Sequence, residues 1–409
     1  MLISFKVANY RSFGEEQMLT FRAKTSPDVE RLVVLSPREN CYKLQALYGP
    51  NAGGKTNWIR ALAVFQLMVM DSSKDTTFEY GLPAEPFRLN SSETAEPTSF
   101  EIEFVYQGCR YDYQMAFTRE KIVKERLSAY PKGREQILFV RKAEGSGDGD
   151  WYFGRCFKGD KRLLKQVTRK DALFLSTAVQ FNCELLRPVF EWIRRHLVIL
   201  SGTKISKEAT VKWLSEHPEC KENVVNFVRQ ADPTIVDLDI RRRLLNLQVF
   251  RSDSAEATTE ESEDSRRELY FLHASGAEMP WYQESAGTLV MFGLASLWLS
   301  AEREEVTLVA DDLDAHWHPL LFKRLLKTIT ANRVQSQLLF TTHNTAYLSD
   351  AALLSREQIW LVERDLETHQ SRLFSLRNAR LQRAKETETI EAMYLDGCYG
   401  TAPLTERKE

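Results

Sequence analysis

One segment of this chain limits its fold more than any other, the loop GPNAGGKT at residues 49–56. An apolar run precedes the loop, and the stretch after it, NWIRALAVFQLMVM, has the apolar spacing of a helix. A strand, a glycine-rich loop and a helix in this order bind phosphate, because backbone N–H groups close around the anion at the helix N-terminus. Lys55 would neutralise phosphate oxygens and the Thr56 hydroxyl would bind Mg²⁺. The sequence therefore predicts an α/β fold with a nucleotide-phosphate site here.

Two further strand ends carry acidic and imidazole groups. The apolar strand VTLVA ends in Asp311 and Asp312, and the apolar strand QLLF is followed by TTH, which ends at His343. Beside a phosphate loop, the first acid can hold the water shell of Mg²⁺ and the second can polarise the attacking water. His343 can contact a γ-phosphate from its strand end. Taken alone, both patterns also fit turn residues that follow buried strands.

A third motif, ESAGT at residues 284–288, stands at the start of a predicted helix. Ser285 and Gly287 offer a hydroxyl, free backbone N–H groups and the positive end of the helix dipole, which together suit an anion. The alternative is that Ser285 is a plain N-cap of the helix.

Acidic and histidine residues crowd the segment that follows the strand VTLVA. They are Asp311, Asp312, Asp314, His316 and His318. A two-metal nuclease needs carboxylates from several strands, whereas these residues follow a single strand. We therefore favour the phosphate-site interpretation, and we interpret His318-Pro319 as a helix start.

The secondary-structure signals divide the chain into three segments. Residues 1–160 read as a lobe of strands with the phosphate loop and a β-subdomain, including a hairpin that turns near Gln107-Gly108. Residues 161–268 read as a helical insertion or lid, with helices as far as residue 248 and a mobile acidic loop at 252–265. Residues 269–409 return to alternating strands and helices. The pattern predicts one α/β domain whose halves are split by the insertion.

Composition excludes several classes of protein. The chain has 55 Lys and Arg against 57 Asp and Glu, and this near-neutral balance argues against wholesale electrostatic binding of nucleic acid or membrane. No apolar run could span a bilayer, and the first residues lack the pattern of a secretory signal. The six cysteines are scattered, as is typical of free thiols in a reducing compartment. We expect a cytoplasmic protein without membrane contact.

The order of the motifs resembles that of ATP-binding cassette (ABC) ATPases of the SMC, Rad50 and RecF kind. Narrower matches resemble the bacterial AAA-annotated, OLD-like abortive-infection ATPases: NYRSF, YGPNAGGKTN, PFRL, SFEIEF, ESAGTL, LDAHWHP, LLFTTHN, QIWLVERD and YLDGCYGTAP. The resemblance runs from Val7 to about Pro403 and implies an ABC-type P-loop ATPase head split by a helical insertion.

The resemblance implies ATP and Mg²⁺ as ligands and gives each motif a role. Lys55, Asp312 and His343 would be catalytic, and Thr56 and Asp311 would hold the metal. Ser285 and Gly287 would contact the ATP of a second subunit in a homodimer or higher oligomer. Arg11 would lie near the phosphates, with a plain surface role as the alternative; the Q-loop glutamine stays unassigned between Gln66 and Gln107. The remaining nucleotide contacts are expected from Gly49, Asn51, Ala52, Gly53, Gly54 and Asn57.

One residue departs from the family pattern, which has Glu where this chain has Asp312. Asp is one methylene shorter, so its carboxylate falls roughly an ångström short of a well-placed water, and misplacement on that scale costs about 10²-fold in rate. We therefore expect slow hydrolysis and a long-lived ATP-bound state.

Three functions remain open at this point. The first is an anti-phage defence ATPase that controls a separate nuclease or toxin effector, because the chain ends before the Toprim module of OLD nucleases. The second is a RecF-like repair ATPase that binds DNA through the basic clusters at 193–196, 241–243 and 266–268. The third is a nucleotide-gated scaffold with little hydrolysis.

Overall fold

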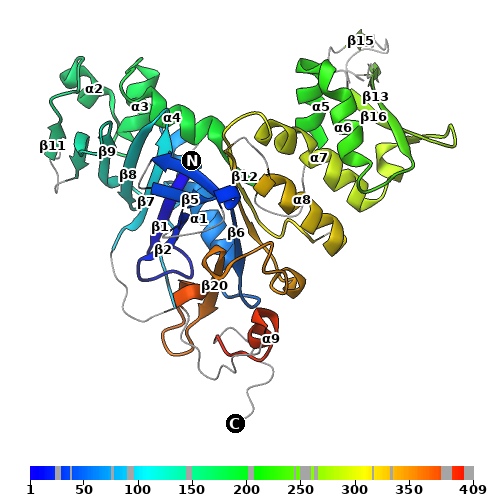
Figure 1. The fold of residues 1–409 in the computed structure, drawn as a ribbon. Coiled ribbons are helices and arrows are strands. Elements are labelled where there is room, and N and C mark those ends of the chain that lie inside the picture. The colour runs from blue at the N-terminus through cyan, green and yellow to red at the C-terminus, as the bar shows by residue number, and fades with distance from the viewer. Residues whose placement is uncertain are drawn as a thin grey trace. The chain divides into compact units, whose positions relative to one another are not determined.

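The computed structural model describes residues 1–23, 29–36, 39–74, 78–89, 96–143, 150–200, 207–243, 246–248, 259–261, 266–315, 317–331, 335–378 and 389–399. The chain divides into two compact units, whose elements are traced in Figure 1. The first unit comprises Met1–Thr203, Glu304–Ala315 and Phe322–Glu409, and the second comprises Lys204–Arg303 and His316–Leu321. No helix among the described residues is long and apolar enough to cross a bilayer.

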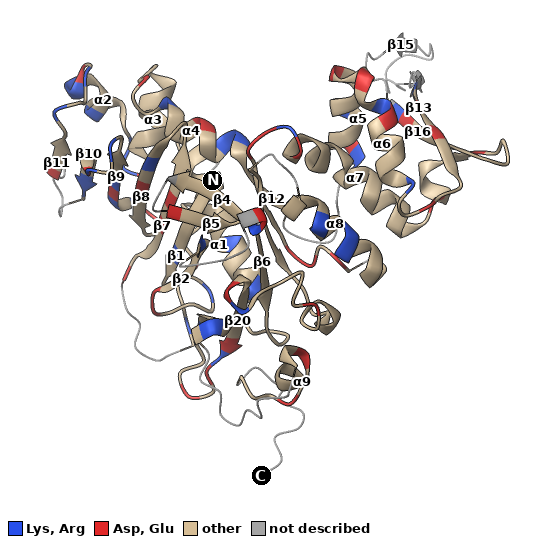
Figure 2. Cartoon of the chain, in the orientation of Figure 1, with Lys and Arg blue, Asp and Glu red and all other residues tan. Residues whose placement is uncertain are grey.

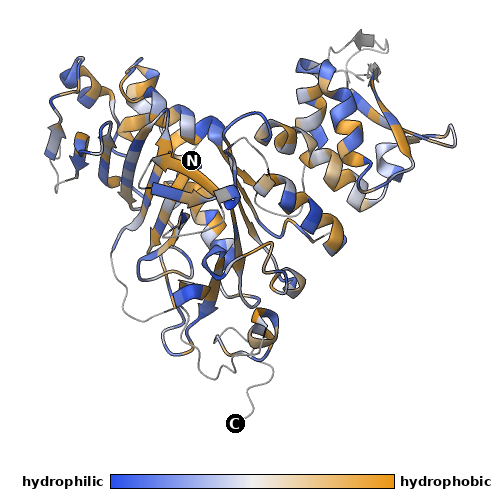
Figure 3. Cartoon of the chain, viewed as in Figure 1, coloured by the Kyte–Doolittle hydropathy of each residue, from blue (hydrophilic) through white to orange (hydrophobic). Residues whose placement is uncertain are grey.

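A six-stranded sheet of the first unit combines strands from both ends of the sequence. Its order is β12-β18-β19-β6-β20-β21, and every neighbouring pair is parallel except β20 and β21. The strands are β6 (Leu44–Tyr48), β12 (Leu197–Leu200), β18 (Thr307–Ala310), β19 (Gln337–Thr341), β20 (Ile359–Arg364) and β21 (Ser371–Ser375). Strands β6, β18 and β19 are buried along their whole length, as parallel strands covered on both faces are, and Figure 3 colours the centre of this unit as hydrophobic.

The position of β6 confirms the predicted split head. Strand β6 lies between β19 and β20, so a strand from the first fifty residues is flanked by strands from the last hundred. The carboxyl ends of β6, β18 and β19 share one edge of the sheet, and this is the edge at which open α/β sheets bind ligands. The three motifs that follow these strands therefore come together there.

A seven-stranded antiparallel sheet has the order β11-β10-β9-β8-β7-β1-β2. Its strands are β1 (Leu2–Ala8), β2 (Gln17–Thr20), β7 (Thr98–Tyr106), β8 (Cys109–Phe117), β9 (Ile122–Tyr130), β10 (Gln136–Lys142) and β11 (Asp150–Phe153). The predicted hairpin is confirmed, because Gln107 and Gly108 join β7 to β8 with φ angles of 50° and 73°. A small antiparallel sheet adds β3 (Arg22–Ala23), β4 (Leu32–Ser36) and β5 (Glu39–Tyr42).

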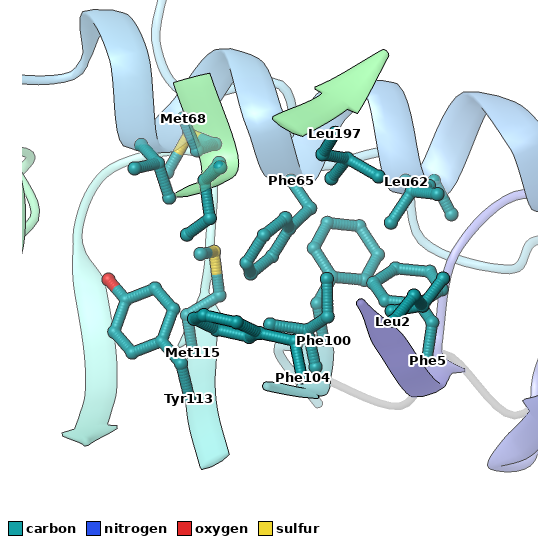
Figure 4. Packing of buried hydrophobic residues seen from close by; sticks show 14 of the residues in the cluster. Leu2, Phe5, Leu62, Phe65, Met68, Phe100, Phe104, Tyr113, Met115 and Leu197 are labelled. Carbon is teal, nitrogen blue, oxygen red and sulfur yellow. The ribbon is translucent and has the colours of Figure 1, made fainter. Parts of the chain in front are cut away.

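Helix α1 (Lys55–Asp71) joins the two large sheets through one hydrophobic core. Figure 4 shows Phe65 and Met68 of α1 facing Phe100 and Met115 of the antiparallel sheet. Side chains from the inner strands of the six-stranded sheet belong to the same core. Because α1 is packed against both sheets, its N-terminus and the loop before it are held in place.

The first unit contains further short helices. They are α2 (Lys161–Val167), α3 (Phe174–Gln180), α4 (Arg187–Glu191), the π-helix η2 (Trp192–His196), α9 (Ile390–Leu395) and the 3₁₀ turns η1 (Val29–Arg31), η5 (Thr345–Tyr347), η6 (Arg356–Gln358) and η7 (Leu376–Asn378). Helix α8 (Pro319–Ala331) begins within residues of the second unit and continues into the first. Its first residue confirms the predicted start at His318-Pro319.

The second unit packs three helices with a three-stranded sheet. The helices are α5 (Lys207–Glu216), α6 (Lys221–Val228) and α7 (Ala286–Ala301), with 3₁₀ turns η3 (Pro218–Cys220) and η4 (Trp281–Gln283). The sheet pairs β13 (Ile235–Arg243), β16 (Arg266–His273) and β17 (Glu278–Pro280), and β14 (Asn246–Gln248) pairs with β15 (Thr259–Glu261). Thr210 of α5 donates a buried hydrogen bond to the carbonyl of Gly293 in α7 at 3.1 Å.

The prediction of helices throughout residues 161–248 is wrong at β12 and β13. Strand β12, with the sequence LVIL, is a short apolar run, and such a run does not distinguish strand from helix by its period. Helices α2 to α4 lie in the first unit, so the compact units have other limits than the segments 1–160, 161–268 and 269–409, which remain a functional interpretation. Most of the acidic segment 252–265 lies outside the described residues.

Candidate nucleotide-binding site

The loop at residues 49–56 leads from β6 directly into α1, as the sequence predicts. A Cβ atom at Gly49 would lie 2.2 Å from the carbonyl oxygen of Val362 in β20. Gly54 has a φ of 125°, and a Cβ there would lie 2.5 Å from the Ser371 hydroxyl. Both positions therefore require glycine, because neighbouring strands press against the loop. Asn51 and Ala52 are exposed at its tip, and Gly53 donates its N–H to the Pro50 carbonyl.

Lys55 is a buried cation whose hydrogen-bond acceptors among the described residues are neutral carbonyl groups. Its side chain is in the first turn of α1, and Nζ donates to the carbonyl oxygens of Gly49 at 2.8 Å and Pro50 at 3.2 Å. Burial lowers the pKa of Lys55 to about 8, although the charges of Asp312 and Asp311 act in the opposite direction. A buried ammonium held by loop carbonyls is well suited to an incoming anion, which forms stronger hydrogen bonds with it.

Asp311 and Asp312 are held by one hydroxyl group. Thr341 ends β19 beside the end of β18, and its Oγ1 donates to Oδ1 of Asp311 at 2.7 Å. The same Oγ1 accepts the backbone N–H of Asp312 at 2.7 Å. Thr341 could not be recognised by a motif, and its place at the end of the strand before His343 was the available signal in the sequence.

Asp312 stands in the left-handed region, with a φ of 46°. Asp and Asn adopt this conformation more readily than other non-glycine residues. Burial and the charge of Asp311 raise the pKa of Asp312, whereas His343 and Lys55 lower it. Asp312 therefore lies in the combined field of the three other predicted site residues, as their convergence at the sheet edge requires.

His343 is exposed at the same edge of the sheet. Partial desolvation and the Lys55 ammonium lower the pKa of His343, against the influence of the aspartates. The imidazole is therefore neutral near pH 7 and has a donor and an acceptor nitrogen available.

A second network, which the sequence did not reveal, supports this edge. Asp314 accepts hydrogen bonds from the Thr342 hydroxyl at 2.8 Å and the Tyr347 hydroxyl at 3.0 Å. Tyr48, the last residue of β6, donates to the carbonyl of Asn344 at 3.1 Å. These bonds tie the turns after β18 and β19 to the end of β6 and fix the spacing of the strand ends.

The NYRSF segment contacts the start of α1. Asn57 donates from Nδ2 to the Ser12 hydroxyl at 2.9 Å, and Ser371 donates its hydroxyl to the Gly53 carbonyl at 2.7 Å. Arg11 itself has a φ of 51° and an ion pair with Glu85 at 2.7 Å. Arg11 thus lies one residue from a contact with α1, while its guanidinium is engaged by a carboxylate.

The two candidates for the Q-loop glutamine, Gln66 and Gln107, both have structural roles. Gln66 donates from Nε2 to the carbonyls of Ile193 and Leu197, and so links α1 to the start of β12. Gln107 forms the tight turn between β7 and β8.

In the second unit, Ser285 is the N-cap of α7. Its Oγ accepts the backbone N–H of Thr288 at 3.1 Å and lies 2.9 Å from the Thr288 hydroxyl. Glu284 beside it pairs with His273 at 2.8 Å. Gly287 is in the first turn of α7. The capping role is therefore present in the geometry; a role toward a second subunit stays a prediction.

The crowded acidic segment after β18 contains residue types that can ligate a metal ion. Among the described residues no group of three or more His, Cys, Asp or Glu side chains is arranged to hold a metal ion. His316 lies outside those residues, and His318 accepts the backbone N–H of Leu320 at the start of α8.

Comparison with known proteins shows the family of the chain. Residues 44–178 and 214–350 match the family described as "AAA domain, putative AbiEii toxin, Type IV TA system". No curated protein matches the chain.

Solved structures of SMC heads resemble the chain at low sequence identity. An SMC head bound to the C-winged helix domain of ScpA has 12% identity and a TM-score of 0.48 over 93% of this chain and 99% of that one. The SMC head domain from Thermotoga maritima has 14% identity and a TM-score of 0.40 over 91% and 98%. An Smc head with an extended coiled coil, bound to the C-terminal domain of ScpA derived from Pyrococcus furiosus, has 13% identity and a TM-score of 0.43 over 92% and 97%.

Proposed function

Because the chain belongs to this AAA family of P-loop ATPases, we propose that it binds ATP, hydrolyses it slowly, and regulates a separate nuclease or toxin in an anti-phage defence system. One observation carries the proposal. The carboxyl ends of β6, β18 and β19 bring Asp311, Asp312 and His343 into the electrostatic field of the buried Lys55.

Each residue has a task in this function. Lys55 exchanges its two carbonyl acceptors for phosphate oxygens of ATP, and the loop N–H groups bind the same oxygens. Asp312 accepts a hydrogen bond from the attacking water, and neutral His343 contacts the γ-phosphate. Charge stabilisation and positioning supply most of the rate in phosphoryl transfer, so small displacements of Asp312 are costly.

The residues also fit a magnesium ion. Thr341 occupies only Oδ1 of Asp311, so Oδ2 has no hydrogen-bond donor within the described residues and is available to the water shell of a metal. Thr56 follows Lys55 in the first turn of α1. Its hydroxyl group has no hydrogen-bond partner in the described part of the chain and is therefore available to a metal. Mg²⁺ would neutralise charge on the phosphate oxygens.

In this proposal ATP joins two copies of the chain. Ser285 and Gly287 of the facing subunit would complete each site, because a capped helix N-terminus with small residues presents a positive dipole end to an anion. Arg11 would approach the phosphates after release from Glu85. Hydrolysis would then separate the subunits and release or restrain the effector.

Nucleotide binding and phosphate release by the purified chain test the enzymatic part. We expect a fluorescent ATP analogue to bind in the presence of Mg²⁺, and we expect turnover slower than that of Asp312→Glu. Absence of binding, or equal turnover of the two proteins, would contradict the proposal.

The dimer is tested with Ser285→Arg, which places a bulky cation at the N-terminus of α7. We expect this variant to bind ATP but to remain monomeric in light scattering. Ser275→Arg in the exposed turn between β16 and β17 is the matched control and should dimerise with ATP. ATP-dependent dimers of Ser285→Arg would refute the in-trans role.

The regulatory part is tested by co-expression with a nuclease or toxin encoded beside this gene. We expect effector activity to change when Lys55→Ala replaces the wild-type chain. An effector that responds equally to both chains would exclude nucleotide-dependent control.

The repair alternative needs free basic surface, and much of the described basic surface is paired. Arg241 forms ion pairs at 2.8 Å with Asp239 and Glu278, and Arg195 forms one at 2.8 Å with Glu191. Figure 2 shows red Asp and Glu positions interspersed with blue Lys and Arg positions along the chain. Tight, salt-dependent binding of plain duplex DNA by the wild-type chain would nevertheless favour repair over defence.

A further inference from the structure

A cavity of about 670 Å³ lies in the first unit, lined by residues of α2, the turn before it and the turn after α3. This volume is in the range of binding pockets in proteins. Its lining is mainly apolar, from Cys156, Leu163, Leu164, Phe181, Cys183 and Leu185. None of the residues to which the nucleotide site was assigned takes part in it.

Two large apolar side chains of this lining stay partly open to solvent. Leu163 is 45% exposed and Phe181 is 51% exposed. Burial raises the pKa of Cys183, so its thiol is neutral and adds to the apolar wall. Exposed apolar side chains around a hollow mark sites where another molecule buries an apolar group.

Residues 155–170, which include α2 and the turn before it and are called the rim below, form a strongly basic segment beside the cavity. Residues 155–170 contain a single acid, Asp160, and the following basic residues: Arg155, Lys158, Lys161, Arg162, Lys165, Arg169 and Lys170. Figure 2 shows blue Lys and Arg positions along α2. Lys158 lines the cavity, and Lys158 and Arg162 are exposed, with no carboxylate partner among the described residues.

The two carboxylates of the lining are already engaged. Asp160 accepts the backbone N–H of Leu163 at 2.9 Å as the N-cap of α2. Glu184 binds Arg187 through both oxygens, with N···O distances from 2.9 to 3.1 Å. Arg187 offsets the charge of Glu184, and residues 155–170 have seven basic side chains against the one acid Asp160, so the charge around the cavity is positive on balance and a docking group should be negative.

We propose that this cavity, with Leu163 and Phe181 at its mouth and Lys158 and Arg162 at its rim, is the docking site for an acidic segment of a partner protein that inserts one large apolar side chain. A protein segment fits better than a nucleic acid, because the apolar hollow has room for a side chain while a phosphate backbone would use only the basic rim. This inference rests on the proposed function only because it expects a protein partner. Docking at this cavity does not require bound ATP, since the cavity shares no residue with the nucleotide site.

Short fluorescein-labelled peptides test the docking site on the full-length protein without nucleotide. The probe is EDELWDED, which has an apolar centre between acids. We expect its binding, measured by fluorescence anisotropy, to be at least about tenfold tighter than that of EDEAADED, which lacks the anchor, or KKKLWKKK, which reverses the charge. Binding of either control peptide as tight as that of the probe would overturn the proposal.

Two pairs of substitutions separate the rim from the hollow. Lys158→Glu with Arg162→Glu should weaken the probe about tenfold, whereas Arg324→Glu with Lys327→Glu on the exposed face of α8 makes the same change in net charge and should leave it unchanged. The double variant Leu163→Ala with Phe181→Ala should also weaken binding of the probe peptide about tenfold. Its control is Leu366→Ala with Leu395→Ala, at side chains that are 48% and 61% exposed.

The remaining outcomes are also decisive. Equal effects of a test pair and its control pair would refute a specific site, and tighter binding of a single-stranded oligonucleotide than of the probe would assign the surface to nucleic acid. Lys55→Ala should bind the probe as the wild type does. Loss of ATP binding and loss of docking would therefore be recognised separately, and unchanged thermal melting of each variant confirms that it is folded.

Discussion

The loop around Lys55 and the helix start at Ser285 are both predicted phosphate contacts, yet they differ in how far their polar groups are already satisfied. Within the described part of the chain, Lys55 is a buried charge with two carbonyl acceptors, and Asp312 has an uncommon left-handed conformation. Ser285 instead completes a standard N-cap, with its Oγ bonded to Thr288. The first region holds a buried charge with neutral acceptors and a residue with positive φ, whereas the hydroxyl of Ser285 in the second is already bonded without a ligand.

This difference indicates that the two regions contribute to nucleotide binding in different ways. Strained or incompletely paired groups cluster where binding and chemistry occur, because a ligand can restore what the fold withholds. A satisfied cap provides only an oriented dipole. We therefore expect substitutions in the first region to change binding and turnover, and substitutions in the second to change stability or association.

The largest effect is expected for Lys55→Ala. This variant removes the buried ammonium, and hydrogen bonds to charged groups are each strong, so ATP affinity should fall on the order of 10²-fold or more. Isothermal titration calorimetry measures the change. Lys74→Ala, just past the other end of α1 where Lys74 pairs with Asp71, is the control and should bind ATP normally. If Lys55→Ala binds ATP with unchanged affinity, the loop at residues 49–56 is not part of the ATP site.

Asp312→Glu should increase phosphate release by up to about 10²-fold, because the longer side chain reaches the attacking water. Glu is less suited than Asp to a φ of 46°, so we also expect a slightly lower melting temperature. Asp312→Asn, which keeps the size but not the charge, should be slower than wild type. A Glu variant no faster than Asp would show that reach is not limiting.

Thr341→Val should lower the maximal rate about tenfold, as loss of a group that orients a site residue commonly does. The substitution keeps the shape but removes the hydrogen bonds to Asp311 Oδ1 and to the Asp312 N–H. Thr341→Ser should restore the rate, since it keeps the hydroxyl. If the Thr341→Val and Thr341→Ser variants have the same maximal rate in steady-state kinetics, Thr341 has only a packing role.

ATP affinity should fall several-fold as the pH rises from 8 to 9. Burial lowers the pKa of Lys55 from 10.5 to about 8, so the free chain loses this positive charge in that range. Stability should change in the opposite sense. The unfolded chain keeps the proton up to the higher pKa, so this group's contribution to the free energy of unfolding rises with pH between the two values. Measuring ATP affinity and thermal melting at the same series of pH values distinguishes the two effects. An ATP affinity that stays constant between pH 8 and 9 would contradict the lowered pKa of Lys55.

The smallest effect is expected for Ser285→Ala. It should reduce the free energy of unfolding by about 1 kcal/mol, the usual contribution of an N-cap, without changing ATP binding by a single chain. Ser285→Thr keeps a capping oxygen and should lose less in chemical denaturation. A loss of nucleotide affinity in monomeric Ser285→Ala would erase the contrast between the two regions.

The sequence predicted the parts whose signals are local. The loop at residues 49–56, the strand ends at Asp311 and His343 and the cap at Ser285 each follow from residue types at fixed spacing, and each has the expected local structure. Strand β12 was missed because a four-residue apolar run has no distinctive period.

The contacts that hold the site were beyond sequence reasoning for a different reason. The bonds of Thr341 to Asp311 and of Ser371 to Gly53 join residues that are far apart along the chain and adjacent only in the folded sheet. The cavity beside α2 likewise depends on how two turns pack. No periodicity or motif in a single sequence encodes such pairings.

The placement of β6 between β19 and β20 also has a consequence for how this protein is made. Leu44 aligns with Leu338, and Ala46 aligns with Ile359, so the strand that carries the loop has neither neighbour until most of the chain has left the ribosome. Pairings so distant in sequence form slowly, and unpaired strands of intermediates are prone to aggregate. Nascent chains should therefore acquire the ability to bind nucleotide only late in synthesis, after the second unit has emerged.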